Sequence, residues 1–289
     1  MSKLDMVLSA EQQALSQQVE DLLVGRNLRG MKEVQPALVP GYYGRAAQLI
    51  GQCTGTVLIG TGFPVVDTFE TDGPVGAIAL YDVIKHLGAT PVLVCGDPLA
   101  SAISNDYRVH RLAINALNNR VKEARDGLAL LQPELVISIE RPGLSGDNGY
   151  FNMRGEDISP RCASFDEFLN QAQCPTIAIG DGGNEIGMGN IQSAIEGLDI
   201  VASATCCDEL LIADVSNWAA HGLIALLSAA KKQDLFALVN TSKTLQYISE
   251  RGSLDGVTRK NTLTEDSLPV SAGDELVAKL RHLTGFELS

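Results

Sequence analysis

The chain has 289 residues, 45% of them hydrophobic and 20% charged, a balance that is typical of a globular protein and excludes a disordered or fibrous chain. It carries 22 Lys and Arg against 35 Asp and Glu, which gives a formal net charge of −13. Nucleic-acid backbones and anionic membranes repel such a chain, so we expect neither of them as a partner.

Two features of the sequence predict a cytoplasmic protein. The first residues, MSKLDMVLSAEQQ, contain charges and glutamines and lack the apolar core of a signal peptide. None of the six cysteines lies in a C-x-x-C motif, and most of them lie in apolar runs, as reduced structural thiols do.

The first predicted element is an amphipathic helix over residues 7–24, in which Leu8, Leu15, Val19 and Leu22 form one apolar stripe. Apolar runs of strand length follow and alternate with helical patterns; they span residues 56–60, 91–96, 135–140, 176–180 and 200–205. Strands of this kind require a parallel sheet that is covered on both faces. We therefore predict a three-layer α/β fold with a mostly parallel sheet, helices on both faces and an N-terminal helical extension.

We expect a single domain over residues 1–289, in which the extension, residues 1–43, packs on a core of residues 44–289. The most apolar stretch, residues 210–230, contains polar side chains that a membrane-spanning helix would have to desolvate. It is predicted to be a buried helix in which His221 makes a structural hydrogen bond.

Three connections are longer than the usual βα loop of about 2–6 residues. They span residues 61–73, 141–163 and 181–190. Each starts at the carboxyl end of a predicted strand, where ligands bind in open parallel sheets, so we expect the three loops to form one cleft.

Helix-start signals follow two of these loops. Pro74 suits the first position of a helix that Asp72 or Gly73 caps, and Ser164 with Glu167 predicts a capping box for the helix after the second loop.

The three loops also contribute acidic side chains to the predicted cleft. These are Glu70, Asp72, Glu140, Asp147, Asp181 and Glu185. Carboxylates gathered in one cleft repel each other unless protons, a cation or a substrate ammonium group neutralise them. Oxygen ligands favour Mg²⁺, Mn²⁺ or Ca²⁺ over Zn²⁺, so we predict a divalent metal ion. The alternative is that each acid only caps a helix or faces solvent.

The third loop, DGGNEIGMGN, is rich in glycine, so its backbone N–H groups could approach a phosphate or a carboxylate, aided by a helix that begins after Asn190. A tight turn that needs glycine explains the same residues. The loop is neither a Walker A motif nor G-x-G-x-x-G, so no nucleotide cofactor is expected. In the second loop, Arg141 and Arg154 could hold a substrate carboxylate, and Tyr150 could donate or accept a proton.

Four motifs in the same order make the chain, from about Leu58 to its end, similar to the D-glutamate cyclase family. They are TGFP with ETDGPVGA, ERPG followed by DNGYFNMRG, GDGGNEIGMGN, and VSNW at 215–218. The family is associated with converting D-glutamate to 5-oxo-D-proline and water. The resemblance therefore implies a hydro-lyase that acts on an amino acid, with a divalent metal as cofactor. The chain departs from the family pattern in TEDSLP, at 264–269, where relatives have a sequence closer to TVDGLP.

The chemistry of that reaction assigns roles to the candidate residues. The predicted metal ligands are Glu70, Asp72, Asp181 and Glu185. The predicted catalytic residues are Glu140, Asp147 and Tyr150. The predicted substrate-binding residues are Thr61, Gly62, Arg141, Asn152, Arg154, Gly182, Gly183 and Asn184. We also expect a homo-oligomer. Two other readings stay open: a different metal-dependent small-metabolite enzyme, such as a phosphatase or a sugar-phosphate lyase, and a non-catalytic amino-acid sensor.

Overall fold

The computed structural model describes residues 7–287 and contains a six-stranded sheet whose neighbouring strands are all parallel. Its strand order is β5-β4-β1-β6-β7-β8. The strands are β1 Thr56–Thr61, β4 Thr90–Gly96, β5 Val109–Leu112, β6 Pro133–Ile139, β7 Thr176–Gly180 and β8 Glu209–Ile212. The central strands are buried on both faces, as their near-continuous Val, Ile and Leu content predicts.

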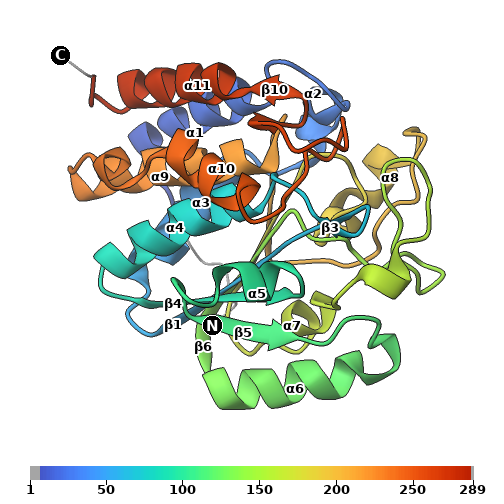
Figure 1. Cartoon of the computed structure of the whole chain (residues 1–289). Helices are drawn as coiled ribbons and strands as arrows, with labels where there is room; N and C mark the ends of the chain where they lie inside the picture. The colour runs from blue at the N-terminus through green and yellow to red at the C-terminus, as the bar shows by residue number, and fades with distance from the viewer. Residues whose placement is uncertain (1–6, 288–289) are drawn as a thin grey trace.

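Helices cover both faces of the sheet (Figure 1), so the predicted three-layer α/β class is confirmed. On one face α3 Tyr42–Gln52, α4 Pro74–His86 and α9 Ser216–Lys231 pack on the sheet, and α1 Ala10–Leu23, α10 Thr241–Ser249 and α11 Val270–Leu283 pack on these helices from outside. The other face carries α5 Leu99–Ile103, α6 Arg120–Leu131 and α7 Asp166–Asn170. Two short helices, α2 Met31–Val34 and α8 Gln192–Ile195, lie in connecting segments.

Smaller elements complete the chain. Two hairpins each have a two-residue turn: β2 Pro64–Val65 with β3 Thr68–Phe69, and β9 Thr264–Glu265 with β10 Leu268–Pro269. Short 3₁₀ turns span Gln35–Ala37, Leu117–Asn119, Ser159–Arg161, Met188–Ile191 and Leu235–Leu238. Within residues 7–287, no helix has both the length and the apolar character needed to cross a membrane.

The N-terminal helix is present as α1, and Ser9 and Gln12 form a capping box at its start. It packs against α3 and α9, as expected of an extension. The expected boundary after residue 43 falls inside α3, because Tyr42 and Tyr43 are buried in the main core together with the rest of that helix.

Four of the five predicted strands are present, and the strand predicted over residues 200–205 is wrong. In that segment the N–H of Ser203 donates to Gly183 O and that of Ala204 donates to Leu144 O, so the backbone bonds to loops and not to the sheet. The edge strands β5 and β8 were missed. The helix predicted over residues 210–230 is wrong at its start, because residues 210–212 belong to β8 and α9 begins only at Ser216.

The predicted capping box of Ser164 and Glu167 is also wrong. Helix α7 begins at Asp166, and no side chain caps it. Ser164 is buried instead, and the next residue, Phe165, stacks on Phe168.

His221 is completely buried in α9, with its Nε2 3.5 Å from Oγ1 of Thr241 and its ring beside Phe236. Burial lowers the pKa of His221 to about 4. In the unfolded chain a histidine titrates near ~6.5, so below that pH the unfolded state binds a proton that the folded state does not. The contribution of the neutral His221 to the free energy of unfolding is therefore greatest above pH ~6.5 and decreases as the pH drops toward 4.

We expect this loss to amount to about 2–3 kcal/mol at pH 4.5. The measurement is the free energy of unfolding in urea for the wild type and for His221→Gln, at pH 7 and at pH 4.5. Other groups titrate alike in both proteins, so the difference between the two proteins isolates His221. A difference that is the same at both pH values would contradict the expectation.

Candidate functional site

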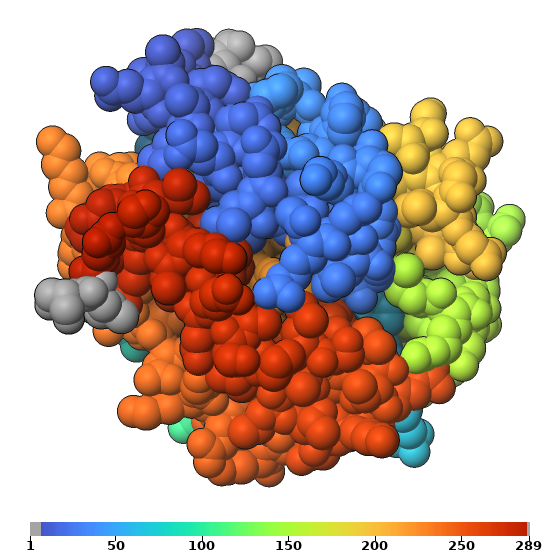
Figure 2. Space-filling view, turned by 90° about the horizontal axis from the view of Figure 1, so that it is seen from above, coloured from blue at the N-terminus to red at the C-terminus, as the bar shows by residue number. Residues whose placement is uncertain are grey.

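The loops that follow β1, β6 and β7 converge, as predicted, on a cavity of about 540 Å³ at the carboxyl edge of the sheet. We call it the acidic cavity, because its lining includes Glu70, Glu140, Asp181 and Asp266. Residues around Arg29 and the β9–β10 turn close it from above. In Figure 2, the blue N-terminal segment and the orange-red segment near residue 260 meet over this end of the molecule.

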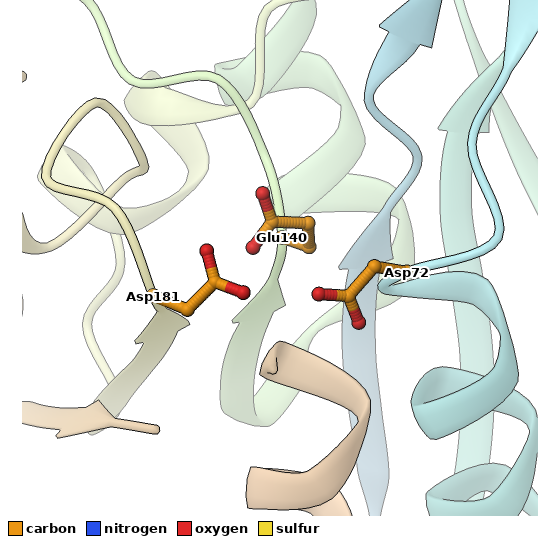
Figure 3. Close-up of side chains that lie close together, drawn as sticks. All are labelled: Asp72, Glu140 and Asp181. Atoms are coloured by element: carbon orange, nitrogen blue, oxygen red, sulfur yellow. The ribbon is translucent and has the colours of Figure 1, made fainter. Parts of the chain in front are cut away.

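Three carboxylates form the centre of the site, and we call Asp72, Glu140 and Asp181 the carboxylate triad (Figure 3). Each offers an oxygen that lies within 4.8 Å of the others, and all three side chains are buried. Glu140 and Asp181 directly follow β6 and β7, and Asp72 ends the loop after β1. Glu140 has φ +45°, a left-handed conformation that costs a non-glycine residue about 1–2 kcal/mol, and its Oε2 accepts a hydrogen bond of 2.6 Å from Oγ of Ser216.

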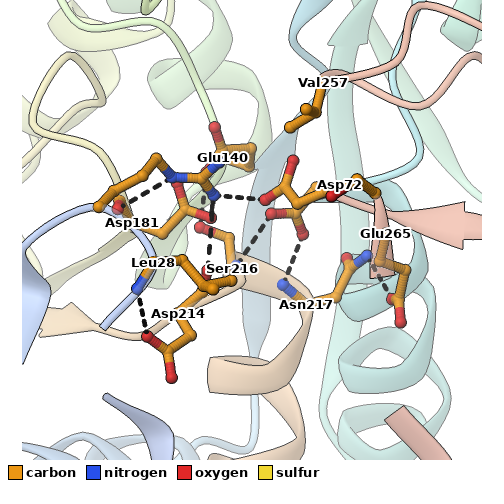
Figure 4. Close-up of polar contacts among 12 residues, drawn as sticks. Leu28, Asp72, Glu140, Asp181, Asp214, Ser216, Asn217, Val257 and Glu265 are labelled. Atoms are coloured by element: carbon orange, nitrogen blue, oxygen red, sulfur yellow. Dashed lines mark hydrogen bonds and ion pairs between the residues drawn. The ribbon is translucent and has the colours of Figure 1, made fainter. Parts of the chain in front are cut away.

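Helices α4 and α9 begin side by side, and each is capped by a residue from the other (Figure 4). Asp72, just before α4, accepts hydrogen bonds from Ser216 N at 2.9 Å and Asn217 N at 2.7 Å, in the first turn of α9. Oδ1 of Asn217 accepts in return from Gly73 N at 2.9 Å and Gly76 N at 2.7 Å. Gly73 holds the N-cap position of α4, as predicted. Because the two helices cap each other in this way, the N-termini of α4 and α9, which carry partial positive charge, both lie next to the triad.

Arg29 supplies the positive charge of the centre. Its guanidinium forms ion pairs with both Asp181 and Asp266, and its side chain is only 18% exposed. The segment that carries it is held by Asp214, whose carboxylate accepts from Arg26 N at 2.7 Å and from Leu28 N at 3.2 Å. Neither Arg29 nor Asp266 was among the sequence candidates. The only signal for Asp266 was its place in the TEDSLP segment, and Arg29 lies in a segment that shares no motif with the loops.

Burial and mutual repulsion raise the pKa values of these acids. Burial has the largest effect on Glu70, Asp72 and Glu140, and the neighbouring carboxylates raise each pKa further. Burial also raises the pKa of Asp181, although the positive charge of Arg29 lowers it in part. Some of these carboxyl groups therefore keep a proton at pH values where exposed carboxyl groups have lost theirs. Protonated and ionised carboxyl groups can then lie side by side in the cluster.

Residues 19–281 match the family model described as D-glutamate cyclase-like, C-terminal. The chain belongs to this family. Over 199 residues it is 29% identical to human mitochondrial D-glutamate cyclase, a match that covers 60% of this chain and 32% of that protein. The chain thus matches about a third of the length of that relative. Among solved structures, an exopolyphosphatase-related protein from Bacteroides fragilis is similar with a TM-score of 0.41 and 10% identity, over 87% of this chain and 62% of that one.

In this D-glutamate cyclase-like chain, Glu185 lies beneath the cavity, where the glycine loop holds it. Its Oε2 accepts a hydrogen bond of 2.7 Å from Gly183 N. The loop's backbone donors therefore bind a carboxylate of the protein itself, and neither Gly182 nor Gly183 lines the cavity. The helix expected after Asn190 is only the four-residue α8.

Three other sequence candidates lie away from the triad. Asp147 is exposed at a turn. Tyr150 is buried against Phe63 and donates a hydrogen bond of 2.5 Å to Oδ2 of Asp166, because its loop folds back toward the sheet. Arg141 points to the other side of its strand, where it donates to the backbone oxygens of Thr61, Gly62 and Ala163.

The remaining candidates divide between two neighbouring hollows. Thr61 and Gly62 line a second hollow of about 230 Å³ together with Arg141. Asn152, Arg154 and Asn184 line the acidic cavity. Of the predicted metal ligands, Glu70 lines the cavity, Asp72 and Asp181 belong to the triad, and Glu140, predicted to be catalytic, completes it.

The donor set suits a hard divalent cation. The triad offers carboxylate oxygens only, which Mg²⁺ and Mn²⁺ prefer. Oε1 of Glu70 and Oγ1 of Thr61 are buried without a hydrogen-bond partner in the described part of the chain, and both residues border the triad. The residues present therefore fit a metal ion held by Asp72, Glu140 and Asp181.

Proposed function

We propose that the acidic cavity is the active site of a D-glutamate cyclase, a hydro-lyase that converts D-glutamate to 5-oxo-D-proline and water. Family membership and the similarity to human D-glutamate cyclase support the reaction class. The observation that carries the proposal is the triad of buried carboxylates, whose raised pKa values suit the proton transfers that this reaction needs.

The reaction requires two protons to move from nitrogen to oxygen. The α-ammonium group of glutamate loses one proton to become a nucleophile, and its nitrogen then bonds to the γ-carboxyl carbon. The nitrogen loses a second proton as the amide forms, while one γ-carboxyl oxygen gains two protons and leaves as water. The protein gains and loses no net proton, so a cluster that exchanges protons within itself is sufficient.

The side chains of the cavity suggest a division of roles. Glu140, which Ser216 hydrogen-bonds, accepts protons from the substrate nitrogen. Glu70, which has the acids Asp266 and Asp72 as neighbours, holds a proton and donates it to the departing oxygen. Arg29 keeps Asp181 and Asp266 in place through its two ion pairs.

A divalent cation, when bound by Asp72, Glu140 and Asp181, would stabilise negative charge on the γ-carboxyl oxygens during ring closure. The two helix N-termini beside Asp72 support the same negative charge.

The test is direct. The purified protein is freed of metal with a chelator and incubated with D-glutamate or L-glutamate, alone and with Mg²⁺ or Mn²⁺, and 5-oxoproline is followed by chiral chromatography. We expect 5-oxo-D-proline from D-glutamate only, with a higher rate when metal is added. No product under any condition would refute the proposed reaction, and equal rates with and without metal would refute the metal's role.

A further inference from the structure

The acidic cavity is lined by basic as well as acidic side chains. Its floor carries the carboxylates described above, whereas Arg154, Arg161 and Arg259, in addition to Arg29, contribute guanidinium groups to its lining. Arg161 lies where the cavity meets the second hollow, since it lines both of them. A ligand that fills the cavity therefore contacts negative and positive protein groups at once, as a zwitterion requires.

Arg154, Arg161 and Arg259 differ in their partners and in their exposure. Arg154 forms no ion pair within the described residues, but it is exposed, and its Nη2 donates a hydrogen bond of 3.0 Å to the backbone oxygen of Val257. Arg259 is paired with Glu156 through its Nη2 at 2.5 Å. Arg161 is only partly exposed and forms no ion pair within residues 7–287, and its Nη1 donates a hydrogen bond to the backbone oxygen of Val66 at the tip of the β2–β3 hairpin. That bond orients the guanidinium of Arg161 and leaves Nε and Nη2 as a fork for an anion.

Ring closure determines which part of the substrate reaches this arginine. The nitrogen and the γ-carboxyl group bond to each other, so both must lie at the carboxylate floor. The α-carboxylate takes no part in the bond changes and is the one charged group left to extend from the floor. A group of this kind supplies binding energy and orientation without reacting.

We propose that Arg161 binds the α-carboxylate of the substrate and thereby makes the site selective for α-amino acids over simple amines. This inference rests on the proposed function. Contacts to the nitrogen, the γ-carboxyl group and the α-carboxylate fix three substituents in space, which also lets the site distinguish one enantiomer of glutamate from the other.

The test compares D-glutamate with 4-aminobutyrate, which lacks the α-carboxylate and cyclises to 2-pyrrolidinone. The variants are Arg161→Gln, Arg161→Lys and the control Arg125→Gln, which removes an exposed arginine of α6 that is paired with Asp126 and lies outside both hollows. We expect R161Q to raise KM for D-glutamate about 10- to 100-fold with a smaller change in kcat, and R161K to lie between R161Q and the wild type. R125Q should stay within about threefold of the wild type.

The decisive quantity is the preference for D-glutamate over 4-aminobutyrate, which R161Q should lose and R125Q should retain. R161Q that keeps the wild-type preference overturns the inference. If R161Q fails to fold, judged by its thermal unfolding, R161K decides in the same way.

A binding measurement separates this inference from the proposed function. Calorimetry with 5-oxo-D-proline and 2-pyrrolidinone, on the wild type and R161Q, needs no turnover. If the wild type forms no product but binds the carboxylated ligand better through Arg161, the reaction is wrong and the inference holds. If the wild type binds neither ligand, or binds both equally, the inference is overturned.

Discussion

Replacing Glu140 by glutamine is expected to lower kcat for D-glutamate cyclisation by about 10²- to 10⁴-fold, the usual contribution of a positioned proton-transfer group. The amide keeps the size of the side chain and still accepts the hydrogen bond from Ser216, so the left-handed backbone at residue 140 is retained. It cannot exchange protons with the substrate. Steady-state rates of 5-oxo-D-proline formation measure the effect.

The matched control for Glu140→Gln is Asp147→Asn, which makes the same chemical change in another acid of the second loop. Asp147 is exposed and lies outside the cavity lining, so this variant should keep wild-type activity. If D147N lost activity and E140Q retained it, the catalytic assignment would pass from the triad to the exposed turn. Thermal unfolding of both variants tests that the fold is unchanged.

Replacing Asn217 by alanine is expected to lower the free energy of unfolding by about 3–5 kcal/mol. The amide accepts hydrogen bonds from Gly73 N and Gly76 N and donates to Thr71 O and Oε1 of Glu265. All these groups are buried, and without Asn217 they lose these hydrogen bonds; Gly73 N keeps a second one, to Oδ1 of Asp72. Each buried group left without a partner costs about 1–3 kcal/mol before relaxation. Urea unfolding followed by circular dichroism measures the loss.

Asn240→Ala is the comparison for this prediction. Asn240 caps α10, where its side chain accepts a hydrogen bond from Lys243 N near the surface, so its loss should cost about 1 kcal/mol. Equal effects of N217A and N240A would show that the exchange of caps between α4 and α9 adds nothing beyond an ordinary helix cap.

Much of the acidic cavity was accessible from the sequence because loops at the carboxyl ends of parallel strands must lie at one edge of the sheet. Glu140 and Asp181 each directly follow a recognisable strand, so their convergence is a consequence of topology. Glu185 was accessible in the same way, yet its role differs. Glu185 lies only two residues after Gly183, so its carboxylate can fold back and accept a hydrogen bond from the N–H of Gly183 in the same loop.

Other parts of the site could not be derived in this way. Arg29 reaches Asp181 and Asp266 across 152 and 237 residues of sequence separation. No local pattern encodes such a contact; it depends on how Asp214 holds the N-terminal segment over the sheet edge. Arg141 failed as a candidate for a related reason. The sequence places Arg141 at the start of the second loop, but it does not say toward which side of the sheet the side chain points.

What the sequence by itself determined was the class of fold, the edge of the sheet at which the cavity lies and the acidic character of that cavity. Apolar periodicity sets which segments are strands, and strand direction sets where their loops meet. What only the tertiary structure decided was which charges pair: Arg29 with two acids, Arg259 with Glu156, and Arg161 with none in the described chain. Pairing depends on side-chain direction and on contacts between segments far apart in the chain, where differences of a few ångströms separate a buried ion pair from a group free to bind substrate.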